Sequence, residues 1–223
     1  MVLPESDEGS ISISGRELEV WPKTTRIDDW VEPTIKVVQF PDAEQIRQGL
    51  VARILDLEHD EILSQAIGGI AGSRKIYHLD RWKCPEADLI DARAKALFKR
   101  VVGAETAAVD LSWANIYRQG DYCLPHGHVR ATAAVVYFLD LGNDGRSGPG
   151  HGQFCFADPR LKVCCQREAH AMTTPCGPTV SNGTMIIFPG KLVHFVDTYR
   201  DPGTRITLSW NINSTTIAGD PLA

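Results

Sequence analysis

The sequence contains no apolar run long enough to cross a membrane, no excess of basic residues and no apolar segment close behind its first residues. The longest mostly apolar run, residues 131–139, is about half of the roughly 18 residues that a membrane-spanning helix requires, so it predicts a buried strand. The opening residues, MVLPESDEGS, are acidic and lack the apolar stretch of a signal peptide. We therefore expect a cytoplasmic protein without a membrane partner.

Charge and cysteine content argue against two further classes. The 28 acidic side chains outnumber the 23 basic ones and give a formal net charge of −5, so we expect no nucleic acid partner. Six cysteines in 223 residues do not suggest a small disulfide-stapled scaffold, and we expect them to be reduced thiols. A chain of this length can bury its own core, so we expect any metal to serve chemistry rather than folding.

Helical periodicity is confined to residues 1–103, which we interpret as a support. Apolar residues alternate around Gly15 and predict a small hairpin. Asp42 with Gln45 three residues later has the chemistry of a helix start, and Pro85 opens a second helix that we expect to end at Gly103. Each helix carries an apolar face that predicts packing onto a sheet: Ile46, Leu50, Ile54 and Leu57 on the first, and Ile90, Ala94, Leu97, Phe98 and Val101 on the second.

Residues 104–223 have the pattern of short strands separated by glycine- and proline-rich segments. Some of these segments are too long for tight turns, and we interpret residues 142–152 as a loop covering a site. Strands are expected at 109–117, 131–139, 153–156, 184–188 and 204–212. The fold class is therefore α+β and mainly β, a sandwich or barrel with helices on one face, and the two parts form one compact domain.

Three of the seven histidines form a suggestive pattern. His126 and His128 are two residues apart, so on a strand both rings would point to the same face and could bind one ion. His194 follows a Phe-Pro-Gly turn and could begin a neighbouring strand at the mouth of a barrel. The alternative is that each histidine is an ordinary hydrogen-bonded residue, and an H-x-H pair alone does not decide between the two.

The segment RITLSWNIN adds a second feature. Arg205 and Thr207 share one face of this predicted strand, and a guanidinium beside a hydroxyl can clamp a carboxylate. Ser209 and Asn211 continue this polar face, whereas the intervening residues are mostly apolar. A surface ion pair is the alternative for Arg205, but the two-faced strand favours a site facing inward.

The stretch from Trp113 to Asn213 resembles the iron(II)- and 2-oxoglutarate-dependent oxygenases. The resemblance rests on the ordered motifs WANIYRQGDYCLPHGH, AAVVYFL, FCFADPR, FPGKLVHF and RITLSWNIN. It is greatest with a small bacterial and phage group in which H-x-H replaces the usual H-x-D/E. The resemblance implies a double-stranded β-helix (jelly roll, cupin-like), with the N-terminal helices as its buttress.

The resemblance also implies roles for individual residues. His126 matches the first iron ligand and His194 the distal one. Arg205 and Thr207 match the pair that binds the distal carboxylate of 2-oxoglutarate. Tyr117 stands where a tyrosine often reaches the same co-substrate, and Asn115 on the same strand face can contribute. The implied cofactors are Fe(II), 2-oxoglutarate as co-substrate, and O2.

His128 is the departure from the usual pattern, because most of the family has a carboxylate at this position. We predict that His128 is the third ligand, which leaves the same number of open positions on iron as a carboxylate would. The alternative is that His128 turns away and water or an anion takes the third place.

The predicted function is therefore that of a dioxygenase that oxidises, most often by hydroxylation, a C–H bond of a small molecule. An amino acid or a carboxylate-bearing metabolite is the first candidate, with Arg130 and Arg146 as substrate-binding residues. One alternative is a three-histidine iron dioxygenase of cupin type that is independent of 2-oxoglutarate. Another is a non-catalytic jelly-roll binding module, and for all three we expect a monomer or a homodimer.

Overall fold

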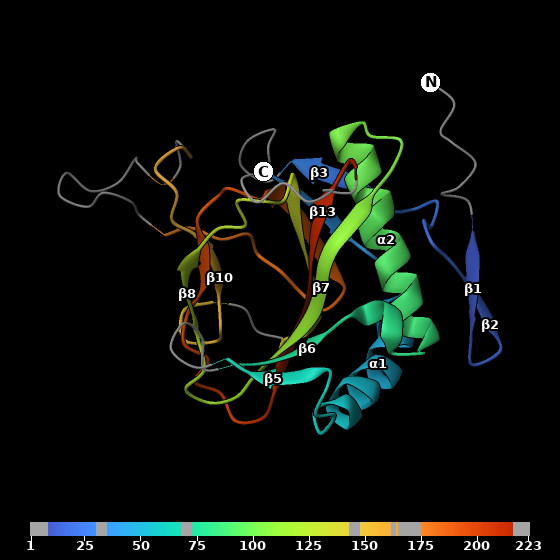
Figure 1. The fold of residues 1–223 in the computed structure, drawn as a ribbon, viewed down its shortest axis with the longest axis horizontal. Helices are drawn as coiled ribbons and strands as arrows, with labels where there is room; N and C mark the ends of the chain where they lie inside the picture. The colour runs from blue at the N-terminus through green and yellow to red at the C-terminus, as the bar shows by residue number, and fades with distance from the viewer. Residues whose placement is uncertain are drawn as a thin grey trace.

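The computed structural model describes residues 9–29, 35–67, 73–142, 148–161, 164 and 175–215, and its fold is drawn in Figure 1. Within these ranges the chain forms a large antiparallel sheet, a small antiparallel sheet facing it, and two helices on the outer face of the large sheet. Among the described helices, none is both long and apolar enough to span a bilayer.

The large sheet has the strand order β3-β4-β11-β9-β13-β7-β6-β5. Its central strands are those that the sequence predicted, with boundaries that differ by a residue or two. The strands span Ile27–Asp29 (β3), Lys36–Gln39 (β4), Ser64–Ala66 (β5), Arg74–Tyr77 (β6), Ala108–Tyr117 (β7), Ala133–Asp140 (β9), Thr184–Pro189 (β11) and Arg205–Asn213 (β13).

The small sheet has the order β10-β12-β8, and its strands are short. They span Cys123–His126 (β8), Phe154–Phe156 (β10) and His194–Val196 (β12). Figure 1 shows this sheet on the side of the large sheet that is remote from the helices. Two antiparallel sheets that face each other in this way form the expected double-stranded β-helix.

Side-chain alternation along the strands produces two apolar layers. On β9, Val135 and Tyr137 belong to the layer between the large sheet and the helices. Their neighbours Val136 and Phe138 belong to the layer between the two sheets. Because both faces of β9 are covered, its residues 133–139 form a continuous hydrophobic sequence.

The two predicted helices are confirmed as α1 (Ala43–Leu57) and α2 (Pro85–Val102). Gly103 ends α2 in the left-handed conformation, with φ of 74°, as its position after the apolar stripe predicted. The predicted cap on α1 is wrong in its chemistry, because Asp42 makes no side-chain cap. Its carboxylate instead accepts hydrogen bonds from the buried Arg93 of α2, at 2.8 and 2.5 Å, which ties the two helices together.

The N-terminal part of the chain also supplies strands. The predicted hairpin is confirmed as β1 (Ser10–Ile13) and β2 (Arg16–Glu19), joined through Gly15 with φ of 75°. Strands β3 to β6, which the sequence did not predict, extend the large sheet at both edges. The large sheet is therefore continuous across residue 103, and the strand pairs β6–β7 and β4–β11 join the two halves of the sequence.

Candidate active site

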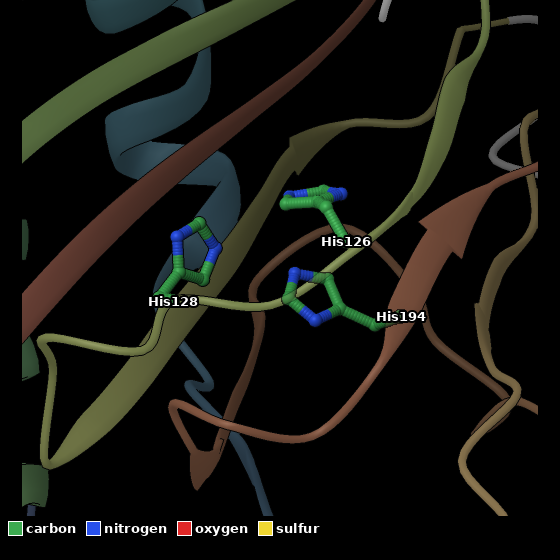
Figure 2. Close-up of side chains that lie close together, drawn as sticks. All are labelled: His126, His128 and His194. Carbon is green, nitrogen blue, oxygen red and sulfur yellow. The ribbon is translucent and has the colours of Figure 1, made fainter.

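Three histidines converge between the two sheets. One potential ligand nitrogen from each of His126, His128 and His194 lies within 4.8 Å of the others, and Figure 2 shows the rings gathered around a common space. His126 ends β8 and His194 begins β12, and the two residues are directly opposite each other in the antiparallel pair. The sheet register therefore brings together residues that are far apart in the sequence.

His128 reaches the cluster by a different route from the predicted one. The sequence prediction placed His126 and His128 on one strand face, but β8 ends at His126. The chain then turns through Gly127, and the backbone N–H of His128 donates to the carbonyl oxygen of Gly190 at 2.6 Å. This contact with the Phe-Pro-Gly turn orients His128, so the convergence is confirmed although its geometric reason was wrong.

Backbone carbonyls fix the orientation of two of the rings. Nδ1 of His126 donates to the carbonyl oxygen of Leu124 at 2.8 Å, and Nδ1 of His194 donates to that of Leu192 at the same distance. In each ring the proton on Nδ1 leaves Nε2 with a free lone pair. Metal-binding histidines are held in the same way, because the second nitrogen is anchored by a hydrogen bond.

Burial keeps these imidazoles neutral. Desolvation is the main cause that lowers the pKa of His128 to about 4 and that of His194 to about 3, and it also lowers the pKa of His126. Phe154 stacks on His194 with ring centroids 5.5 Å apart, and Phe188 lies against the same ring at 4.8 Å. Neutral imidazole is the form that binds metal, so the aromatic wall favours the ligand state.

Arg205 begins β13 deep in the same cavity, where it is only 1% exposed. Its Nε and Nη1 atoms have no hydrogen-bond partner among the described residues. The guanidinium lies over the rings of Tyr117 and Phe138, with 5.2 and 5.7 Å from its carbon to the ring centroids. A guanidinium stays charged even though burial lowers its pKa, and a buried charge without a counter-ion is costly. This arrangement fits an anionic ligand such as a carboxylate.

A hydrogen-bonded row lines the cavity beside Arg205. Nδ2 of Asn115 donates to Oγ1 of Thr207 and to Oγ of Ser209, both at 3.3 Å, and Oδ1 of Asn115 accepts from Nε1 of Trp113 at 3.1 Å. The amide of Asn115 is therefore already engaged and orients the wall. Because Thr207 accepts from Asn115, its hydroxyl hydrogen is free to donate to a ligand.

Tyr117 and the glycine loop complete the region around Arg205. Tyr117 is directly opposite Arg205 in the β7–β13 pair, and burial raises its pKa, so it remains a neutral phenol. Gly152, with φ of 66°, packs so closely that an added Cβ would lie 2.7 Å from Cδ of Arg205. The end of the predicted covering loop thus contacts the guanidinium, whereas residues 143–147 of that loop lie outside the described residues.

Of the two predicted substrate-binding arginines, only Arg130 lies within the described residues. Arg130 is exposed, in the turn after His128, and is not among the residues that line the cavity. Arg146 lies outside the described residues. The sequence prediction missed Lys75 of β6, which lines the cavity beside Trp113.

Asp158 is a further missed residue next to the site. It is fully buried and accepts a hydrogen bond from the backbone N–H of Val193 at 2.8 Å, directly before His194. It also accepts from the backbone N–H and Nε of Arg160, at 2.9 and 2.8 Å. Asp158 is the aspartate of the FCFADPR motif, for which the sequence predicted no individual role.

Comparison with known proteins agrees with this geometry. Residues 111–211 match the family model described as "Putative 2OG-Fe(II) oxygenase", and this range contains the three histidines, Arg205 and Thr207. This stretch of the chain therefore carries a domain of this oxygenase family. The cofactors of this family are iron(II) and 2-oxoglutarate, and the residues fit both. Three neutral imidazoles suit the metal, and Nε and Nη1 of Arg205, which have no hydrogen-bond partner among the described residues, suit the carboxylate of the 2-oxo acid.

Solved structures show the same fold at low sequence identity. A prolyl hydroxylase from Trichoplax adhaerens, in complex with a hypoxia inducible factor peptide, is 12% identical, covers 84% of this chain and 88% of its own, and has a TM-score of 0.60. AviO1 from Streptomyces viridochromogenes is 15% identical, covers 87% of this chain and 99% of its own, and has a TM-score of 0.59. A prolyl-4-hydroxylase from Pseudomonas putida is 16% identical, covers 79% of this chain and 91% of its own, and has a TM-score of 0.56. Comparison of the oxygenase with curated protein sequences gives no significant match.

Proposed function

We propose that this oxygenase hydroxylates a C–H bond of a small molecule, with an amino acid or a carboxylate-bearing metabolite as the first candidate. His126, His128 and His194 would hold iron(II), and Arg205, Thr207 and Tyr117 would hold 2-oxoglutarate. The bound metal and co-substrate supply the oxidising power, as O2 is consumed and 2-oxoglutarate is converted to succinate and CO2. Hydroxylation is the outcome we favour because prolyl hydroxylases are among the proteins that share this fold.

The observation that carries the proposal is the buried guanidinium of Arg205, whose Nε and Nη1 have no hydrogen-bond partner in the part of the chain that the structure describes. A buried charge of this kind has no structural use in an inert jelly-roll module, because a neutral side chain would fill the same space at lower cost. It equally has no role in a three-histidine dioxygenase that works without a 2-oxo acid. The fork of a guanidinium matches a carboxylate in two hydrogen bonds, and Thr207 can add a third.

His128 would be the third protein ligand. Its ring centroid lies 5.1 Å from that of His126 and 5.1 Å from that of His194, so the three rings form a nearly symmetric group. The hydrogen bond from its backbone to Gly190 keeps this position relative to the turn that precedes His194. In the alternative arrangement, His128 would rotate out and a water or an anion would take its place.

Anaerobic addition of iron(II) and 2-oxoglutarate tests the co-substrate. We expect a weak visible charge-transfer band that appears only when both are present. Absence of the band in the wild-type protein, together with turnover that does not need 2-oxoglutarate, would favour the cupin-type dioxygenase. Failure to bind iron(II) at micromolar concentration would favour the binding module.

Two substitutions at His128 test the metal ligand. We expect His128→Ala to lose iron, because one of three protein ligands is removed, and we measure iron content and the charge-transfer band. His128→Asp supplies the carboxylate common in the wider family but on a shorter side chain, and loss of iron in this variant too would support a true imidazole ligand. Full activity of His128→Ala would remove His128 from the ligand set.

The remaining assignments complete the proposal. Residues 1–103 would act as the support of the barrel and residues 104–223 as its catalytic core. Arg130, which is exposed in the turn after His128, and Arg146 would contact an anionic substrate. The described cysteines are free thiols, which supports a reducing cytoplasm, and the acidic net charge supports a small molecule over a nucleic acid. We propose a monomer or a homodimer.

A further inference from the structure

Lys75 is a second cation in the cavity. It lies on β6, and its side chain lines the cavity together with the three histidines and Arg205. Its Nζ lies 4.7 Å from the centroid of the Trp113 ring, which is the geometry of a cation–π contact. Trp113 is itself held by its hydrogen bond to Asn115, so the ring is a fixed platform for the ammonium.

No carboxylate forms an ion pair with Lys75 among the described residues. The ammonium of Lys75 interacts electrostatically with the thiol of Cys123 and with the rings of His126 and His128, and desolvation is the main cause that lowers the pKa of the lysine. The neighbouring Arg74 provides a contrast, because it lies 3.6 Å from the carboxylate of Glu58. Adjacent residues on one strand point to opposite faces. On β6, Arg74 therefore points away from the cavity and pairs with Glu58, whereas Lys75 points into the cavity and has no carboxylate partner among the described residues.

The register of the sheet separates Lys75 from the co-substrate clamp. Lys75 is opposite Asn115 on β7, and Asn115 is in turn opposite Thr207 on β13. Two strand spacings, about 10 Å, therefore lie between the backbones of Lys75 and Thr207. Arg205 lies two residues further along β13, beside Tyr117. With 2-oxoglutarate on Arg205, Lys75 would remain available to another anion.

We propose that Lys75 binds a carboxylate of the primary substrate, with Trp113 as the apolar surface beneath it. The inference rests on the proposed function and names the substrate class for the same cavity. An ammonium held over an indole ring at the wall of a half-enclosed cavity is partly desolvated, so a carboxylate gains more from it than from a surface lysine. Lys75 would thereby select acids over their neutral amides.

The test compares acetate with acetamide, which differ little in size but differ in charge. Anaerobic protein loaded with iron(II) and saturating 2-oxoglutarate is titrated with each compound labelled with 13C at the carbonyl carbon. Broadening of the 13C line by the paramagnetic iron reports binding near the metal. We expect saturable binding of acetate, at least tenfold tighter than that of acetamide.

Three variants test whether Lys75 causes the preference for acetate over acetamide. Lys75→Met should bring the affinity for acetate to within about threefold of that for acetamide, while Lys75→Arg, which keeps the charge, should retain at least half of the preference. Lys23→Met removes an exposed lysine that does not line the cavity and should behave as the wild type. The charge-transfer band shows in each variant that 2-oxoglutarate is still bound.

The outcomes separate the two proposals. An unchanged preference in Lys75→Met, or no preference in the wild type that forms the band, overturns the role of Lys75 alone. A Lys75→Met variant with more than about threefold weaker 2-oxoglutarate binding would instead assign Lys75 to the co-substrate. A wild-type protein that forms no band with iron(II) and 2-oxoglutarate overturns the proposed function, and this inference fails with it.

Discussion

The two faces of β13 lie in contrasting environments along one backbone. Both faces are buried, but the face toward the helices is apolar and the face toward the cavity is polar. The first set is Ile206, Leu208, Trp210 and Ile212, and the second is Arg205, Thr207 and Ser209. The difference teaches that burial alone does not show what a residue does. On this strand, alternate positions serve stability and ligand binding, and substitutions should separate the two.

Trp210→Ala should have the largest effect, and it should be on stability. Trp210 is fully buried against the helices, and its Nε1 donates to Oδ1 of Asp91 at 2.8 Å. Removing the ring leaves a cavity and takes one hydrogen bond from the carboxylate of Asp91, which keeps its ion pair with Lys95. We therefore expect the free energy of unfolding to fall by about 3–5 kcal/mol. Urea denaturation measures this loss. A loss below about 1 kcal/mol would contradict the division between the two faces.

Arg205→Met should have the opposite effect, because it should weaken ligand binding and leave stability intact. The variant removes a buried charge without a partner, so the free energy of unfolding should be unchanged or higher. The dissociation constant for 2-oxoglutarate should rise about 100-fold, since charge-assisted hydrogen bonds contribute about 1.5–3 kcal/mol each. Arg118→Met, which removes an outer arginine paired with Glu58 at 2.7 Å, is the matched control and should leave that constant unchanged. Equal 2-oxoglutarate binding in both variants would contradict the clamp.

Asp158→Asn should lower both the stability of the fold and the affinity for iron. Hydrogen bonds from Arg160 are the main cause that lowers the pKa of Asp158 to about 2, from an ordinary value of 3.8. Such a shift corresponds to about 2 kcal/mol of stability that is present above pH 4 and is lost as the pH falls toward 2. We expect the substitution to remove this acid-dependent part of the unfolding curve and to weaken iron binding, because Val193 next to His194 loses a charged acceptor. Wild-type iron affinity in the variant would limit Asp158 to stability.

Thr207→Val should have the smallest effect and should test the cavity face alone. The substitution keeps the shape but removes the hydroxyl that accepts from Asn115. A single neutral hydrogen bond contributes about 1 kcal/mol, so the dissociation constant for 2-oxoglutarate should rise about fivefold, with at most a comparable loss of stability. Calorimetric titration of 2-oxoglutarate measures the change. An unchanged dissociation constant would show that Thr207 only orients Asn115.

The sequence was informative wherever local chemistry decides the structure. Pro85 and Gly103 mark the two ends of α2 because the first has no N–H to leave unpaired and the second tolerates a positive φ. The alternation on β13 identified its inward face, because Arg205 and Thr207 are two residues apart and share one face while the apolar residues between and after them share the other. The histidine cluster was predicted from spacing and from the resemblance together.

The missed features depend on contacts between distant segments. Asp42 has the local pattern of a helix cap, but Arg93, which lies 51 residues later, competes for its carboxylate. Lys75 belongs to a four-residue strand next to the edge of the sheet with only one fully buried residue, and a lysine in such a segment is normally interpreted as solvent-facing. Its inward direction follows from pairing with β7, which no local pattern of residues 74–77 encodes.

The register of β8 and β12 has a consequence for the folding of the whole chain. His126 and His194 are opposed across these two short strands. An ion bound by both would close a long loop and act as a reversible cross-link in the smaller of the two sheets. By mass action, a metal at 100 times its dissociation constant adds about 2.7 kcal/mol to the stability of the folded state. Metal supply would then govern the thermal lifetime of the protein as well as its turnover.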